Sequence, residues 1–175
     1  MLSTIESEDE VFMKKRWFVY IIIGVLFGIF DFYYQEVTKG IAITSYAVWF
    51  VVAWAIWLIP IIPIVLYESK ISKSKVMSAF ANVLTWSVAT ISYYLFIPIK
   101  LMFIGQVSRK EMYISNYRDP FYWSNLKSIL LGDVLGSILT WIVVAIAGGF
   151  IIGFLISFTY LNFKKNHNVK IETTN

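Results

Sequence analysis

The sequence predicts an all-α integral membrane protein, built as a bundle of four transmembrane helices. Of its 175 residues, 58% are hydrophobic and only 15% are charged, and the mean hydropathy is +0.69. A soluble domain has about 25% charged residues and less than half apolar ones. The charges collect in short blocks between long apolar runs, and no run alternates like a membrane barrel strand. We therefore expect a single membrane domain over residues 1–175.

Four apolar runs are long enough to cross a hydrocarbon core about 30 Å thick, which takes about 20 helical residues. Within lipid, every backbone amide must find its hydrogen-bond partner inside its own segment, so each run is predicted to be a helix. The runs extend over residues 17–34, 41–67, 76–102 and 134–163. They leave two polar tails, residues 1–16 and 164–175, and one sizeable loop, residues 103–133.

The orientation of the bundle follows from the lysines and arginines near the ends of the runs. One side receives nine of them: Lys14, Lys15, Arg16, Lys70, Lys73, Lys75, Lys164, Lys165 and Lys170. The other side receives six: Lys39, Lys100, Arg109, Lys110, Arg118 and Lys127. This excess predicts a multi-pass protein of the cell membrane, with both termini in the cytoplasm and the long loop outside.

Three prolines lie within the apolar runs. Pro60 and Pro63 stand in the last part of the second run, and Pro98 in the last part of the third. Because proline removes a helical hydrogen bond and clashes with the preceding turn, we expect each to end or kink its helix near the membrane surface. The alternative is a broken helix of the kind that transporters use to expose backbone to a substrate.

The long loop contains the elements of one more helix. Asp119 and Pro120 form a helix start, with a capping side chain and a proline at the first helical position. Trp123, Leu126 and Leu130 would share one face of a helix in the headgroup plane, closed by Gly132. An ordinary belt of interfacial aromatic residues is the alternative.

Small residues at helical spacing predict close helix packing. The chain has three GxxxG patterns: Gly24 with Gly28, Gly132 with Gly136, and Gly149 with Gly153. Ala145, four residues before Gly149, extends the last pattern. In lipid, small residues let two backbones approach and gain dispersion contacts. The contacts are expected inside the monomer's own bundle, and a homo-oligomer or another membrane protein is the alternative partner.

The third run has polar residues on a single face. Ser78, Asn82, Thr85, Ala89 and Ser92 follow one another at spacings of three and four residues. Unpaired hydroxyl and amide groups are unfavourable in lipid, so this face should meet protein or water. We expect hydrogen bonds between helices, with a hydrophilic path for a small solute as the alternative. Asn82 is the residue of this face whose side chain carries an amide group, and it lies well inside the third run.

Asp31 is the charged residue whose depth needs an explanation. At 1.5 Å per residue it lies about 22 Å from Arg16, short of the outer edge of the hydrocarbon. An ionised aspartate at that depth costs about 1–3 kcal/mol unless it is paired or neutralised. We predict a site formed by Asp31 and Lys100, with Asp133 or Glu36 nearby. A structural ion pair, or a locally thinned bilayer around Asp31, are the alternatives.

Composition excludes several kinds of chemistry. There are no cysteines, and the one histidine, His167, lies in the C-terminal tail. No metal site, cofactor or catalytic motif is therefore expected. The basic residues flank apolar runs and are expected to meet lipid headgroups, not nucleic acid. The first expectation for function is a non-enzymatic accessory or assembly subunit. A transporter of a small solute or lipid-linked substrate is second, and a lipid-modifying enzyme is third.

The start of the first run is similar to a known family. Arg16-Trp17-Phe18, with Gly24 and Asp31, resembles the first helix of GtrA-like four-helix membrane proteins. This resemblance implies a role in moving lipid-linked sugars. The family's asparagine-arginine and tryptophan-x-phenylalanine element after the second helix is missing, since this chain reads Tyr67-Glu68-Ser69-Lys70 there.

Overall fold

The computed structural model describes the backbone of residues 2–104 and 118–172, and the side chains of residues 12–38, 45–103 and 118–166. Apart from turns, its described secondary structure is helical: α1 (Leu2–Thr44), α2 (Tyr46–Ala55), α3 (Leu58–Ser72), α4 (Lys75–Ile104), α5 (Tyr122–Ser128), the π-helix η2 (Ile129–Val134) and α6 (Leu135–Glu172). Four stretches of the described chain are long and apolar enough to cross a membrane: Phe12–Thr38, Tyr46–Ser72, Lys75–Phe103 and Tyr122–Asn166. The predicted fold class is confirmed.

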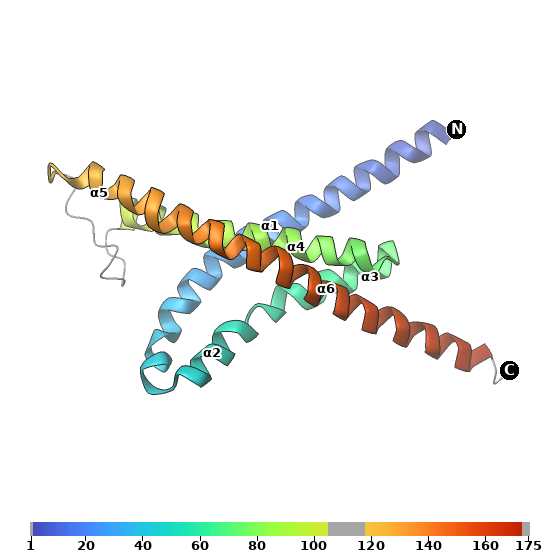
Figure 1. Ribbon diagram of the computed structural model, residues 1–175. Helices are drawn as coiled ribbons and strands as arrows, with labels where there is room; N and C mark the ends of the chain where they lie inside the picture. Colours follow the sequence, from blue (N-terminus) through green and yellow to red (C-terminus); the bar gives the residue numbers. More distant parts are fainter. Residues whose placement is uncertain (1, 105–117, 173–175) are drawn as a thin grey trace.

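Helix α4 is the centre of the bundle and contacts α1, α3 and α6. Figure 1 shows α4 and α6 running side by side, with α1 crossing them and α2 diverging from the pair. Both chain ends lie at the end of the bundle where α3 meets α4, and α5 lies at the opposite end (Figure 1). We call these the terminal end and the α5 end.

The first helix is longer than the apolar run that predicts it. Helix α1 continues to Thr44, so the helix does not end where the apolar run 17–34 ends. The turn comes at Ser45, which has an extended backbone and is the N-cap of α2. Its side-chain oxygen accepts a hydrogen bond from Val48 N at 3.4 Å. A serine N-cap gives the chain a hydrogen-bonded way to begin a new helix.

The second span is broken in its middle. Helix α2 ends at Ala55 and α3 begins at Leu58, and the backbone closes around the break through Trp57 N to Trp54 O (3.2 Å) and Ile59 N to Ile56 O (3.1 Å). Pro60 explains the break, because its ring lacks the N–H that would bond Ile56 O. The prolines do not end this helix, since α3 continues through Pro63 to Ser72. The interruption before Pro60 fits the broken helix that was the alternative. Pro98 likewise lies inside α4.

A helix follows Asp119, but the predicted start is wrong, because Pro120 lies in the turn before the helix and Phe121 is the N-cap of α5. The helix is also not a separate interfacial one. Asp119 Oδ1 accepts from Phe121 N at 2.8 Å, and α5 then continues through η2 into α6. Gly132 therefore does not close it and lies within η2. Trp123 is 70% exposed whereas Leu126 is 4% exposed, so the two do not form one covered face. Residues 105–117, with Arg109 and Lys110, lie outside the described residues.

Candidate functional site

The glycines of α1 and the later part of α6 pack closely inside the chain. A Cβ at Gly24 or Gly28 would meet backbone oxygens of α4, those of Thr85 and Ala89. A Cβ at Gly153 would lie 3.0 Å from Ala79 Cα, and one at Gly149 would lie 3.3 Å from Val83 Cα. These glycines therefore set the distance of α1 and α6 from α4.

The remaining small residues divide between covered and open positions. Ala145 is 1% exposed and packs in a cluster with Ile61, Val65 and Trp86. A Cβ added at Gly132 or Gly136 would have no described atom within 4 Å. Among the described residues, this pair therefore lies on an open face.

The polar face of α4 is used for helix contacts. Asn82 is fully buried and donates from Nδ2 to the carbonyl oxygen of Gly149 at 2.7 Å, which joins α4 to α6. Ser78 Oγ lies 2.9 Å from Ser69 Oγ, which lies 2.8 Å from Ser157 Oγ, so three helices meet at one buried serine cluster. Thr85 donates to Ala81 O of its own helix at 3.0 Å. These contacts favour a structural role of the polar face over a solute path.

The predicted pairing of Asp31 with Lys100 is wrong. Lys100 Nζ lies 2.6 Å from Glu36 Oε2 and stacks over the rings of Phe32 (4.8 Å) and Tyr33 (5.4 Å). Of the four predicted residues, the structure thus brings Lys100 and Glu36 together. Asp133 is exposed in η2.

Asp31 lines a different feature, a pocket between α1, α2, α4 and α6. The pocket has a volume of about 330 Å³. Nine of its lining residues are aromatic: Tyr46, Trp49, Phe50, Trp54, Trp57, Trp86, Tyr93, Tyr94 and Trp141. The others are Asp31, Gln35, Ala53, Thr90 and Val144. The pocket therefore combines one carboxylate with an aromatic wall.

Asp31 has little compensation for its burial. It is 3% exposed, and Gln35 Nε2 donates to its Oδ1 over a long 3.4 Å. Among the described residues no lysine or arginine forms an ion pair with Asp31, and none lines the pocket. Polar groups shielded from water normally have partners, so a carboxyl group placed in this way is suited to hold a proton or to meet a cation.

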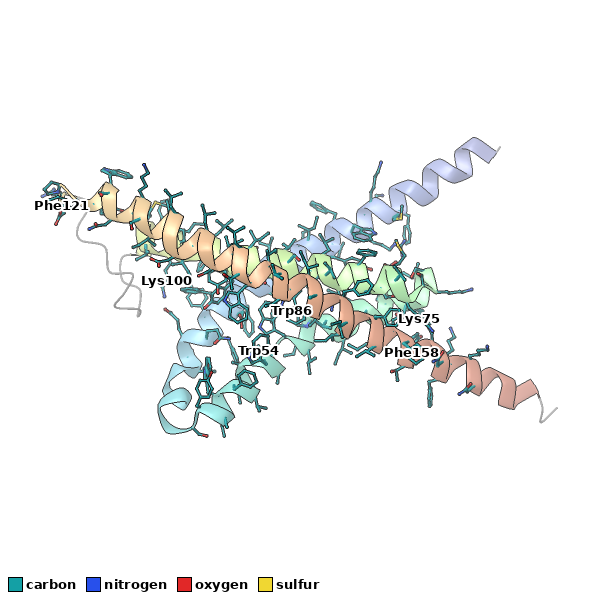
Figure 2. All side chains as sticks on the ribbon, viewed as in Figure 1. Trp54, Lys75, Trp86, Lys100, Phe121 and Phe158 are labelled. Atoms are coloured by element: carbon teal, nitrogen blue, oxygen red, sulfur yellow. The ribbon has the colours of Figure 1, made fainter. Side chains whose placement is uncertain are left out.

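The aromatic wall is built around the break in the second span. Trp54 precedes the break and its ring centroid lies 6.0 Å from that of Trp141 on α6. Trp57 lies in the break, with its ring 5.4 Å from that of Trp86 on α4. Figure 2 shows Trp54 and Trp86 in the middle of the molecule. Lys100 lies on the α5 side of them, and Lys75 lies on the side of the terminal end. Trp49 Nε1 is buried and has no hydrogen-bond partner among the described residues.

Sequence reasoning missed this wall, although the signal was present. Tryptophan collects at membrane interfaces, where its ring can be half hydrated. The chain has seven tryptophans, and five of them line the pocket. Tryptophans well inside three different spans are a sign of a polar or aromatic site, because lipid gives their N–H groups no hydrogen-bond partner.

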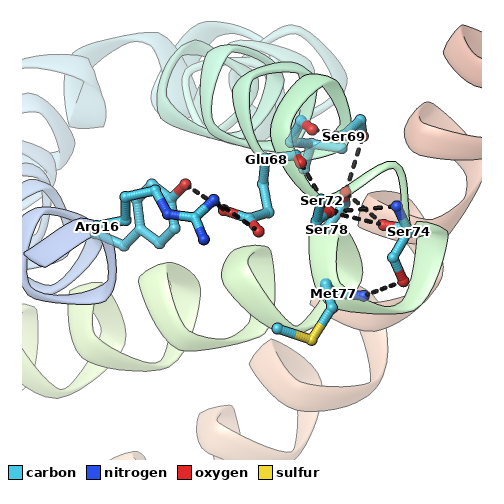
Figure 3. A network of polar contacts seen from close by, with 9 residues as sticks. Arg16, Glu68, Ser69, Ser72, Ser74, Met77 and Ser78 are labelled. Carbon is cyan, nitrogen blue, oxygen red and sulfur yellow. Dashed lines mark hydrogen bonds and ion pairs between the residues drawn. The ribbon is translucent and has the colours of Figure 1, made fainter. Parts of the chain in front are cut away.

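Sequence reasoning also missed a buried ion pair at the terminal end. Glu68 is fully buried in α3, where Arg16 Nη1 lies 3.3 Å from its Oε2 and Tyr20 OH donates to the same oxygen at 2.7 Å. Figure 3 shows Arg16 and Glu68 facing each other, with the buried serines on the other side of the α3 backbone. The run 41–67 placed Glu68 in a loop, whereas α3 continues to Ser72.

The fold and the pocket together define a four-span helical membrane protein with a pocket lined by aromatic side chains and one carboxyl group. No protein-family model, curated protein or solved structure matches the chain. The similarity of residues 16–31 to GtrA-like proteins thus receives no support from these comparisons. Within the described residues, no three histidine, cysteine or acidic side chains are grouped as metal ligands.

Proposed function

We propose that this membrane protein binds a small organic cation with an apolar body, and carries it, in the pocket formed by α1, α2, α4 and α6. The observation that supports this function is the placement of Asp31, a buried carboxylate with no cationic side chain beside it among the described residues. A bound cation would neutralise the carboxylate, which is unfavourable when ionised and shielded from water. The proposal is of a binding and carrier protein, which needs neither catalysis nor a cofactor.

The aromatic wall defines the chemistry of the ligand. The faces of tryptophan and tyrosine rings attract cations, and cages of such rings bind quaternary ammonium groups. The pocket offers five tryptophans and three tyrosines, with one acidic group and no basic one among the residues described. An amine or quaternary ammonium with an apolar substituent matches both the charge and the wall, whereas an anion would face Asp31.

The break in the second span favours a carrier over a static binding protein. Trp57 lies where the helical hydrogen bonds are interrupted, and Ala53 and Trp54 precede the interruption. Transporters place broken helices at their substrate sites, because irregular backbone is tolerated in a membrane where it lines a cavity. Beside the pocket, Ile61, Val65, Trp86 and Ala145 pack as a buried cluster, so passage would require α2 and α3 to move.

Calorimetric titration with benzyltrimethylammonium in dodecyl maltoside tests the binding. Asp31→Asn should weaken binding at least tenfold, about 1.4 kcal/mol, while Asp133→Asn should not, because Asp133 lies outside the pocket. Trp54→Leu should weaken binding, and Trp123→Leu serves as its matched control. Equal affinities for the Asp31 and Asp133 variants would refute the proposal. Uptake of radiolabelled ligand into proteoliposomes then separates a carrier from a binding protein.

An accessory or assembly subunit is the second candidate, and the open Gly132 and Gly136 face favours it. The glycine pairs of α1 and of the later part of α6 are covered inside the chain, whereas no described residue covers this pair. Small residues on an open face allow a partner helix, from a second copy or another membrane protein, to approach. Gly136→Leu should then reduce the oligomer size or the recovery of a partner from native membrane, and an unchanged assembly would exclude this role. For both candidate functions, the expected environment is the lipid bilayer of the cell membrane, with both termini of the chain in the cytoplasm.

A further inference from the structure

A second hollow lies at the terminal end of the bundle and has the opposite character to the aromatic pocket. Its volume is about 390 Å³, and it is lined by Ser69, Lys70, Lys73, Tyr160, Leu161, Lys164 and Lys165. The four lysines come from two different spans, two from the end of α3 and its cap, and two from α6. We call this feature the lysine pocket.

The charges of the lysine pocket are not neutralised by the described part of the protein. None of its lining residues is acidic, and none of the four lysines forms an ion pair within the described residues. The neighbouring carboxylate in the chain, Glu68, is fully buried and faces Arg16 and Tyr20 of α1 instead (Figure 3). Four cations held around one concavity repel one another, and an anion placed between them removes this repulsion.

The backbone holds Lys73 at the pocket in an uncommon conformation. Its φ is 51°, in the left-handed region that residues other than glycine and asparagine rarely adopt, and it caps α3 through Lys73 N to Ser69 O at 3.1 Å. A lysine at a position that favours glycine or asparagine is conformationally unfavourable. Its placement there is consistent with a use for its charge.

From these observations we infer that the lysine pocket binds a phosphate-bearing anion, with the phosphate held by lysines of α3 and α6. Lysine is a common phosphate binder, and basic pockets between spans bind the headgroups of anionic lipids. The phosphate can belong to a phospholipid headgroup or to a soluble ion, since the same chemistry recognises both. This inference does not depend on the aromatic pocket.

Two ligands distinguish the two sources. The delipidated full-length protein in dodecyl maltoside is titrated with cardiolipin in one arm and with sodium pyrophosphate in the other, and adducts are counted by native mass spectrometry. Binding of cardiolipin alone assigns a lipid headgroup, and binding of pyrophosphate assigns a soluble anion. Absence of binding in both arms would overturn the inference.

A matched pair of variants tests the location. The double variant Lys73→Asn with Lys164→Gln should weaken the binding of the ligand found in the first experiment by at least about tenfold. The reason is that each lysine near a phosphate contributes to the binding free energy. Lys73→Asn also suits the left-handed backbone, so this variant should fold. Lys15→Gln with Lys127→Gln removes the same charge elsewhere and should change binding by less than about threefold. Equal losses in the two variants would show general charge attraction and refute the lysine pocket.

Discussion

Lys100 Nζ on α4 lies 2.6 Å from Glu36 Oε2 on α1, and this pair links the two helices near the α5 end. Asp31 precedes Glu36 by five residues, which places the two carboxylates on different faces of α1. Lys100 therefore reaches one of them and leaves the other to the aromatic pocket. Because of this separation, the pocket contains a carboxyl group that no described basic side chain pairs.

This pairing can be measured by double-mutant cycles. Glu36→Gln and Lys100→Met should each destabilise the protein, and the double variant should lose less than their sum, with a coupling of about 1 kcal/mol or more. Asp31→Asn combined with Lys100→Met should instead be additive within about 0.5 kcal/mol. Reversible unfolding in mixed detergent micelles gives these free energies. A strong coupling free energy between Lys100 and Asp31 would contradict the structure and favour an ion pair between these two residues.

The glycines can be tested as two opposite classes. Gly28→Ala should lower the free energy of unfolding by about 1–3 kcal/mol, because the new methyl group would overlap Ala89 O and Ser92 Cβ on α4. Gly136→Ala should stay within about 0.5 kcal/mol of the parent, since no described atom lies within 4 Å of the new group. The same unfolding assay measures both. A large loss in Gly136→Ala would mean that this face is packed.

The buried carboxylate of Glu68 should be important for stability. Glu68→Gln should destabilise by about 3 kcal/mol, because Arg16 and the hydroxyl of Tyr20 lose their charged partner inside the bundle. Tyr20→Phe, which removes a single hydrogen bond, should cost about 1 kcal/mol. Thermal unfolding in detergent ranks the two variants. The reverse order would show that the ion pair contributes little.

The orientation in the membrane is predicted from lysine and arginine counts and can be tested in this cysteine-free chain. Asn166→Cys at the terminal end and Asn125→Cys in α5 both place a thiol at an exposed position. An impermeant maleimide applied to intact cells should label the Asn125→Cys variant and not the Asn166→Cys variant. Labelling of the Asn166→Cys variant alone would invert the orientation.

The helices and their number were predictable because lipid allows little else. A run of about 20 apolar residues can satisfy its backbone in a membrane only as a helix, so composition alone located four spans. The close contacts at Gly24, Gly28, Gly149 and Gly153 were predictable for a similar reason, since small residues at this spacing are useful mainly against another backbone.

The candidate site was not predictable, because it depends on breaks and on which helices are neighbours. Pro60 indicated a disturbed helix, but a proline does not show whether the helix ends there or a new helix follows within the same span. Here α2 ends at Ala55 and α3 begins at Leu58. Trp54, Trp141 and Asp31 come from three spans that meet only in the folded bundle. Depth along the membrane normal could be estimated from sequence, and this estimate singled out Asp31 as a residue that needs an explanation. Its neighbours around the helix axis could not be.

The most direct test of the proposed function is to locate the bound cation. Crystals of the protein soaked with (4-bromobenzyl)trimethylammonium would reveal the bromine by anomalous scattering. We predict a bromine peak inside the pocket lined by Trp54, Trp57 and Trp141, with the ammonium group beside Asp31. Crystals of Asp31→Asn under the same conditions should lose the peak. A peak outside this pocket, or one that persists undiminished in Asp31→Asn, would contradict the proposed function.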